Sequence, residues 1–174
     1  PDDVLDREIL NSLYPDTPYG IESGGDPKNI PDLSYEEFLA FHKKYYHPSN
    51  SYIYLYGDMD MEERLSWLDL EYLSKFDADQ VESEITMQPV FAEVKELDKT
   101  YSISNMEEEE DNTYLAYNWS VGDVLDADLS AAMSIVEYVL LEAPGAPLKQ
   151  ALLDAAVGKD IEGSYDSGVR QPYF

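Results

Sequence analysis

The sequence predicts an α+β fold in two parts, and three observations lead to this prediction. Apolar residues recur at helical spacing over several stretches, most clearly from Leu129 to Leu140. Between such stretches lie runs of β-branched and aromatic residues, such as residues 52–56, which are typical of strands. A polar stretch at residues 77–89 then separates two halves. The pattern indicates a mixed or antiparallel sheet with helices packed on it.

The second predicted helix has the strongest local signals in the chain. Ser34 with Glu37 forms a capping box, and Leu33 with Phe38 occupies the two positions of a hydrophobic staple. The helix is expected to end before Pro48, because a residue that precedes proline avoids the helical region.

The remaining elements follow from the same rules. We expect helices over residues 3–13, from Asp60 onward with Glu63 in a second capping pattern, over the stripe from Leu129 to Leu140, and from Pro147 to Gly158. We expect strands over residues 52–56, 91–104, 113–121 and 161–165. The acidic run at residues 107–111 is interpreted as a solvated hairpin loop between two of these strands.

Composition excludes several classes of protein. The chain has 37 acidic residues against 11 Lys and Arg, a net charge of −26, so nucleic acid is not an expected partner. It has no run of about 18 apolar residues, so no membrane partner is expected. It has no cysteine, which excludes disulfides and thiol chemistry. The acidity either favours basic peptides over long range or only keeps the protein in solution.

The residues by themselves form no complete catalytic or metal site. The only histidines, His42 and His47, are five apart, which places them on different faces of a helix. A helical zinc pair needs a spacing of three or four. Adjacent acids such as Glu36 and Glu37 point apart and suit the positive end of a helix. We therefore assign no catalytic and no metal-binding residue.

Three segments nevertheless carry a resemblance. They are Tyr14-Pro15-Asp16-Thr17-Pro18-Tyr19-Gly20 with Ser23-Gly24-Gly25-Asp26-Pro27, then Ile30-Pro31-Asp32-Leu33-Ser34-Tyr35-Glu36-Glu37-Phe38, then Phe41-His42-Lys43-Lys44-Tyr45-Tyr46-His47-Pro48-Ser49-Asn50, closing on Tyr56-Gly57-Asp58. In this order they resemble the presequence-protease branch of the pitrilysin/insulinase family of zinc metallopeptidases. The resemblance is specific over residues 1–60 and continues more weakly to Leu148.

The resemblance implies a large peptidase of four related α+β domains that closes around unfolded peptides. It implies zinc held by a His-x-x-Glu-His motif and a downstream Glu, neither of which occurs in this chain. We therefore expect an internal piece, a view that both apparently cut ends support. Residues 1–86 would be the C-terminal part of the zinc-site domain and residues 87–174 the N-terminal part of the second domain. Alone, the chain should neither bind zinc tightly nor cut peptides.

The resemblance also implies one site inside the chain, where the family anchors the substrate's N-terminal end on a glycine-containing turn and an edge strand. The matching residues are Pro144, Gly145, Ala146, Ile161, Glu162, Gly163, Ser164 and Tyr165. An exposed edge can add a peptide through backbone hydrogen bonds. The alternative is that Pro144 and Gly145 only form a turn between two helices.

Two other functions stay open at this point. The chain could belong to a non-catalytic homologue or subunit that acts as a peptide-binding or scaffold module, or it could be an unrelated acidic interaction domain. The expected partners are unfolded peptides and the remaining domains of the same chain. The expected location is the bacterial cytoplasm, with the mitochondrial matrix or another organelle as the alternative.

Overall fold

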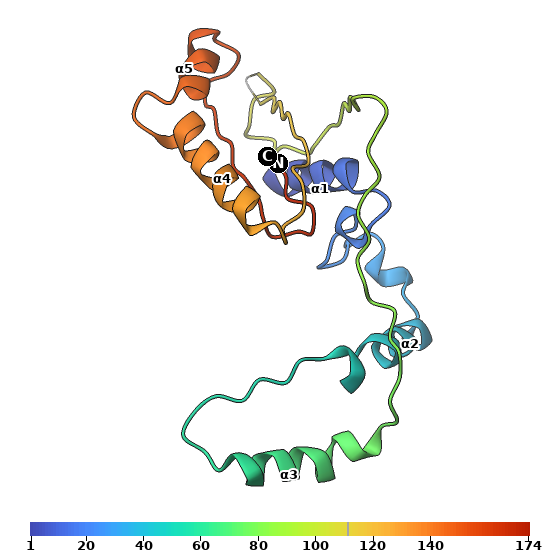
Figure 1. The fold of residues 1–174 in the computed structure, drawn as a ribbon. Helices are drawn as coiled ribbons and strands as arrows, with labels where there is room; N and C mark the ends of the chain where they lie inside the picture. Colours follow the sequence, from blue (N-terminus) through green and yellow to red (C-terminus); the bar gives the residue numbers. More distant parts are fainter. Residues whose placement is uncertain (111) are drawn as a thin grey trace. The chain divides into compact units, whose positions relative to one another are not determined.

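A computed structural model describes residues 1–110 and 112–174 of the chain. These residues form two compact units: Pro1–Gly24 with Ile85–Phe174 (unit 1), and Gly25–Glu84 (unit 2). The α-helices labelled in Figure 1 are α1 Asp2–Leu13, α2 Tyr35–Tyr45, α3 Met61–Glu71, α4 Ala127–Glu137 and α5 Pro147–Asp154. Short 3₁₀ turns are η1 Pro18–Gly20, η2 Ile30–Asp32, η3 Pro48–Asn50 and η4 Leu73–Lys75, and η5 Tyr138–Glu142 is a π-helical turn.

The helix starts read from the sequence are confirmed. The Ser34 hydroxyl accepts a hydrogen bond from the Glu37 amide at 3.2 Å, and the Glu37 carboxylate accepts one from the Ser34 amide at 2.9 Å. These bonds complete the capping box of α2, and the bonds from Ser34 lower the pKa of Glu37. Asp60 caps α3 by accepting from the Glu63 amide at 3.0 Å. Such contacts span three residues, so local sequence is enough to specify them.

The predicted α+β fold is wrong. The described residues form no β-strand. The pairing they show consists of two isolated antiparallel bridges, one from Tyr173 to Ser120 and one from Tyr173 to Asp166. Apart from Ser120, the four predicted strands are irregular. β-branched and aromatic residues favour extended backbone, but a strand is stable only with a partner strand beside it. Among the described residues, Trp119 and Val121 form backbone hydrogen bonds with the end of the chain, and the other three stretches have no such neighbour, so propensity alone produced no sheet.

Side chains, and not a backbone ladder, connect the two predicted strands that flank the acidic run. The rings of Tyr101 and Tyr114 meet edge to face at 5.7 Å, and the Tyr101 hydroxyl donates to the Asn112 carbonyl. The predicted hairpin loop at 107–111 is described only as far as Glu110, because Asp111 lies outside the described residues.

The apolar core of unit 1 lies between η5, the stretch before Asp166 and the end of the chain. Leu141, Tyr165 and Phe174 are its buried members. Half-buried apolar side chains pack against them: Val121, Met133, Leu140 and Leu148. Of the predicted apolar stripe, Met133 and Leu140 pack against this core, while Val136 and Val139 stay exposed, as does Ile135 outside the stripe.

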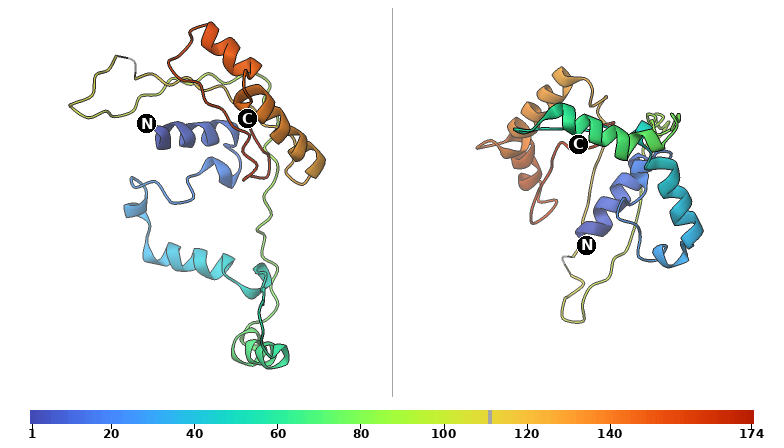
Figure 2. Two further views of the ribbon diagram at one scale, coloured as in Figure 1. Left: turned by 90° about the vertical axis from the view of Figure 1, so that its left-hand side faces the viewer. Right: turned by 90° about the horizontal axis from the view of Figure 1, so that it is seen from below.

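The last five residues tie together distant parts of unit 1. The backbones of Trp119 and Phe174 exchange two hydrogen bonds, at 3.1 and 3.0 Å, and their rings stack at 5.1 Å. The hydroxyl of Tyr14 donates to the Gln171 carbonyl, and the Gln171 side chain binds the backbone of Gln88. Figure 2 shows the C-terminal segment passing the end of α1 and the side of α4.

Alkaline pH should weaken unit 1 through Tyr173. Burial, together with the nearby Asp166 carboxylate that accepts its hydroxyl at 3.2 Å, raises the pKa of Tyr173 to about 12, and Asp6 and Tyr14 add to the effect. A tyrosine in an unfolded chain titrates near pH 10. The stabilisation is therefore complete below about pH 10 and is lost as the pH rises toward about 12.

The measurement is the urea midpoint of unit 1 at a pH of about 9 and of about 11.5 in the natural chain and in Tyr173→Phe. We expect a smaller alkaline loss in the variant, because its ring cannot ionise beside Asp166. Equal losses in both proteins would contradict this assignment. They would mean that other groups cause the loss, such as the lysines, which also lose charge in that range.

Unit 2 has no buried core. None of residues 25–84, all of which the structure describes, is buried. Its aromatic contacts are local, such as Phe41 with Tyr45 at 4.7 Å on α2 and Tyr72 with Phe76 at 5.1 Å after α3. The helices of this unit therefore present apolar side chains to solvent.

The division into two related domains at residues 86 and 87 stays a prediction, since compactness within the chain does not report on repeated ancestry. The described part of the chain also contains no helix with the length and hydropathy needed to cross a membrane.

Candidate functional site

The predicted turn, at residues 144–146, lies between η5 and α5. Gly145 has a φ of +75°, a conformation that favours glycine, and a Cβ added there would meet nothing within 4 Å. The Ala146 amide donates to the Ala143 carbonyl at 2.8 Å, which closes the turn. Pro144 and Gly145 are exposed while Ala146 is buried. The turn is therefore anchored at one end and open to solvent at its tip.

The second predicted stretch has two buried ends and an exposed middle. Ile161 and Tyr165 are each 9% exposed, whereas Glu162, Gly163 and Ser164 are exposed. Among the described residues, no hydrogen bond involves the backbone of these three exposed residues. We call residues 162–164 the open edge. Its amides and carbonyls are free to pair with another extended chain.

Leu141 brings the two stretches together. It lies in η5, three residues before Pro144, and a Cβ added to Gly163 would lie 2.7 Å from its Cδ1 atom. It also shares the buried cluster with Tyr165. The sequence analysis did not single out Leu141. The signal available was its place at the end of the apolar stripe, next to the turn.

Tyr165 differs in one respect from what its residue type suggests. Its hydroxyl is buried and finds no hydrogen-bond partner among the described residues. It therefore anchors the edge by packing and offers no polar contact at the surface. A buried polar group without a partner costs about 1–3 kcal/mol.

The charges around the edge are mainly negative. Between residues 142 and 166 the chain carries five carboxylates and two lysines: Glu142, Asp154, Asp160, Glu162, Asp166, Lys149 and Lys159. Asp160 uses its carboxylate to accept the Ile161 amide at 2.8 Å, which fixes the start of the buried end. A positively charged ligand would be attracted to this surface.

Within the described residues, neither histidine belongs to a group of potential metal ligands. His42 stacks on Tyr46 at 4.6 Å, and the Nδ1 atom of His47 accepts the Ser49 amide at 3.2 Å as the cap of η3. The described residues contain no group of three or more potential ligands that could hold a metal ion. The residues present do not fit a zinc centre, so we derive no catalytic step for this chain.

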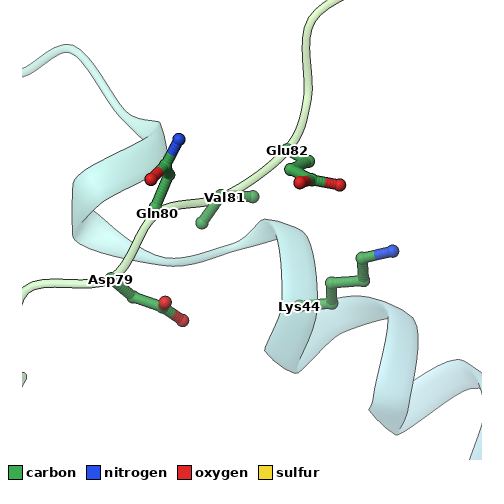
Figure 3. A pocket seen from close by; sticks show the side chains of 5 residues that line it. All are labelled: Lys44, Asp79, Gln80, Val81 and Glu82. Carbon is green, nitrogen blue, oxygen red and sulfur yellow. The ribbon is translucent and has the colours of Figure 1, made fainter.

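A shallow hollow in unit 2, of about 390 Å³, offers no alternative chemistry. Figure 3 shows Lys44 reaching from α2 beside an extended stretch that supplies the other lining residues, Asp79, Gln80, Val81 and Glu82. One ammonium and two carboxylates make no nucleophile and no acid–base pair. The hollow therefore does not compete with the open edge as a candidate site.

Comparison with known proteins decides the family. The model of the family described as "Peptidase M16 inactive domain" matches residues 32–174. The chain belongs to the peptidase M16 family. The presequence-protease resemblance seen in its motifs is thereby confirmed.

The chain is 45% identical over 174 residues to Protein HypA of Clostridium perfringens, covering 100% of this chain and 18% of that protein. It is 36% identical over 178 residues to presequence protease 1, chloroplastic/mitochondrial, of Arabidopsis thaliana, covering 100% of this chain and 16% of that protein. It is 28% identical over 174 residues to the mitochondrial presequence protease of Xenopus laevis, covering 98% of this chain and 17% of that protein. This M16 chain therefore spans about a sixth of the length of these relatives.

Proposed function

We propose that this chain is a peptide-holding part of a zinc-dependent endopeptidase that degrades unfolded peptides in a closed chamber. In this proposal the chain alone is inactive. Family membership and the relatives named presequence proteases support a role in peptide cleavage. The observation that carries the role of this chain is the open edge, whose backbone is unpaired within the described residues and which lies between the buried side chains of Ile161 and Tyr165.

The chemistry of the open edge suits unfolded peptides. Unpaired amides and carbonyls bind the main chain of an extended peptide, which every peptide has, so the contact tolerates many sequences. Gly163 lets the edge lie close to Leu141, because a Cβ there would be 2.7 Å from the Leu141 Cδ1 atom, and Ile161 and Tyr165 hold the edge in place by packing. Pro144, Gly145 and Ala146 would form the rim that receives the peptide's N-terminal end.

Zinc belongs to the parent enzyme in this proposal and not to this chain. The other partners are the remaining domains of the same polypeptide, which would supply the metal ligands and close the chamber. The location follows the relatives: a bacterial protein is among them, as are proteins named mitochondrial or chloroplastic. We propose the bacterial cytoplasm, with an organelle matrix as the alternative.

A second candidate is a non-catalytic homologue or subunit that only binds peptides. The observation that favours it is the description of the matched family model as an inactive domain. The two candidates differ in the longer protein: an intact His-x-x-Glu-His motif elsewhere in it supports the enzyme, and its absence supports the binding module.

Replacing Gly163 with proline in the full-length protein should weaken peptide binding about tenfold and leave the zinc content unchanged. Proline removes one backbone donor from the open edge. A hydrogen bond contributes about 0.5–1.5 kcal/mol, and about 1.4 kcal/mol corresponds to tenfold in affinity. The measurement is the dissociation constant of an unstructured peptide by fluorescence anisotropy, with metal analysis of the same samples.

The matched control is Gly163→Ala, which keeps the amide but places a Cβ against the Leu141 side chain. We expect the alanine variant to lose less affinity than the proline variant. If both variants bind peptide like the natural protein while remaining folded, the docking assignment is wrong. Higher salt should reduce the preference for basic peptides while the backbone contribution persists.

A further inference from the structure

Gln88 is a buried polar residue of unit 1, and each of its polar groups has a partner. The residue is 6% exposed. Its Oε1 atom accepts the Asp16 amide at 2.9 Å, and its Nε2 atom donates to the Asp16 carboxylate at 2.7 Å. Its backbone amide donates to Oε1 of Gln171, and its carbonyl accepts Nε2 of Gln171 at 3.2 Å. We call Asp16, Gln88 and Gln171 the amide clamp.

A carboxamide suits both contacts with Asp16. Asp16 presents one donor, its backbone amide, and one acceptor, its carboxylate. The side chain of Gln88 presents the matching acceptor and donor side by side. A carboxylate there would lack the donor and would face the Asp16 carboxylate with a second negative charge. Because hydrogen bonds are directional, the pair fixes how the turn at Asp16 lies against Gln88, which apolar packing alone does not fix.

The amide clamp holds the segment that lies beside the end of the open edge. Tyr173, two residues after Gln171, exchanges two backbone hydrogen bonds with Asp166, at 2.9 and 3.1 Å. The Tyr173 hydroxyl also donates to the Asp166 carboxylate at 3.2 Å. Asp166 lies two residues after the open edge. The amide clamp and the open edge are therefore connected through a single pair of residues.

Other contacts keep this segment folded when the amide clamp is lost. Trp119 and Val121 hold it through backbone hydrogen bonds, and the Tyr14 hydroxyl donates to the Gln171 carbonyl. Loss of the contacts to Asp16 should therefore shift the segment without unfolding it. An edge that binds an extended peptide needs several amides and carbonyls aligned at once, and hydrogen bonds weaken steeply with misalignment. A small shift is thus enough to reduce binding.

We propose that Gln88 is a positioning residue for peptide binding: through Gln171 it sets where the open edge lies, and the edge binds the peptide. This role rests on the proposed function of the open edge. Gln88 itself does not touch the peptide. Its effect is to keep the edge in the aligned position, and the apparent affinity falls by the fraction of time for which the edge leaves that position.

The test uses the full-length protein and measures the dissociation constant of a labelled, lysine-containing unstructured peptide by fluorescence anisotropy. Gln88→Glu should raise the dissociation constant about tenfold, the loss for an edge that is aligned about a tenth of the time. Adding Asp16→Asn should restore it to within about twofold, because the exchanged pair again matches donor with acceptor and keeps the natural net charge. Gln88→Met, which makes neither bond and adds no charge, should also weaken binding.

The matched control is Asn11→Ala, which removes the 3.0 Å hydrogen bond from Asn11 to the Gly20 carbonyl in the same turn. It should lower the thermal midpoint and leave peptide affinity unchanged. Rescue by the exchanged pair separates positioning from a general loosening of the turn. An equal loss of affinity in Asn11→Ala, or a loss in Gln88→Glu that Asp16→Asn does not restore, overturns the positioning role. If Gln88→Glu does not fold, Gln88→Met decides, and unchanged affinity in it also overturns the role.

Gly163→Pro, measured alongside, tests the open edge separately. If Gly163→Pro weakens binding and the Gln88 variants do not, the positioning role is wrong and the docking assignment stands. If Gly163→Pro binds like the natural protein, the docking assignment fails, and the positioning role fails with it. Loss of affinity in both, with rescue by the exchanged pair and unchanged zinc content, is the expected result.

Discussion

Replacing Tyr14 with alanine should lower the free energy of unfolding of unit 1 by about 3–5 kcal/mol, the usual loss for a large buried aromatic residue. The Tyr14 ring is fully buried, and it meets Tyr19 and Tyr173 edge to face at 6.2 Å each. Its hydroxyl donates to the Gln171 carbonyl. Alanine would leave both a cavity and an unpaired carbonyl beside the C-terminal segment, at a point where α1 joins the end of the chain.

The measurement is urea unfolding followed by tryptophan fluorescence. The chain has two tryptophans, Trp67 in unit 2 and Trp119 in unit 1, so a Trp67→Phe background makes the signal report on unit 1. The matched control is Tyr14→Phe, which keeps the ring and removes only the hydroxyl. We expect it to cost about 1–2 kcal/mol. A loss below about 1 kcal/mol in Tyr14→Ala would show that this ring does not hold unit 1 together.

Replacing Gly20 with alanine should destabilise unit 1 by about 1–3 kcal/mol or more, the range for forcing extra volume into a packed site. A Cβ at this position would lie 2.4 Å from the Tyr14 carbonyl oxygen and 3.2 Å from the Cα atom of Pro15. Both are backbone atoms and cannot rotate away. The Gly20 carbonyl also accepts the Asn11 side chain at 3.0 Å, so a shift of the turn would break a second contact.

The same fluorescence measurement checks this prediction, and Gly24 provides the matched control. A Cβ added to Gly24 meets nothing within 4 Å, so Gly24→Ala should change the free energy of unfolding by less than about 0.5 kcal/mol. Equal effects of the two substitutions would mean that the cost arises from backbone entropy and not from the close approach to Tyr14.

The turn around Tyr14 belongs to a motif that could be recognised in the sequence, but the contacts that the turn makes could not be predicted from it. Tyr14, Pro15 and Gly20 entered the sequence analysis as part of a family resemblance, and comparison with known proteins confirmed that family. Nothing in the order of these residues indicated that the ring would be fully buried or that Gln171 would receive its hydroxyl. Those contacts join residues 157 positions apart, which no local pattern encodes.

The contacts of the candidate site could not be predicted from the sequence either. The resemblance nominated the turn at Gly145 and the stretch from Ile161 to Tyr165, and whether they bind a peptide stays a prediction. The structure adds that Leu141 lies against Gly163 and that Tyr165 is buried with its hydroxyl unpaired. Packing between segments decides which side chains of an extended stretch face inward, so residue type alone could not distinguish an anchor from a contact.

The sequence by itself determined the family and the helix starts, such as Ser34 and Asp60, because caps and motifs are written in neighbouring residues. Only the tertiary structure decided that three of the four stretches with strand propensity remain unpaired among the described residues, and that the last five residues pair with residues 119–121 and close unit 1. Both outcomes depend on which distant segment lies alongside, and a strand without a neighbour has no hydrogen-bonding partner for its backbone. Propensity makes an extended segment ready to pair, and the presence or absence of a partner determines whether it becomes a strand.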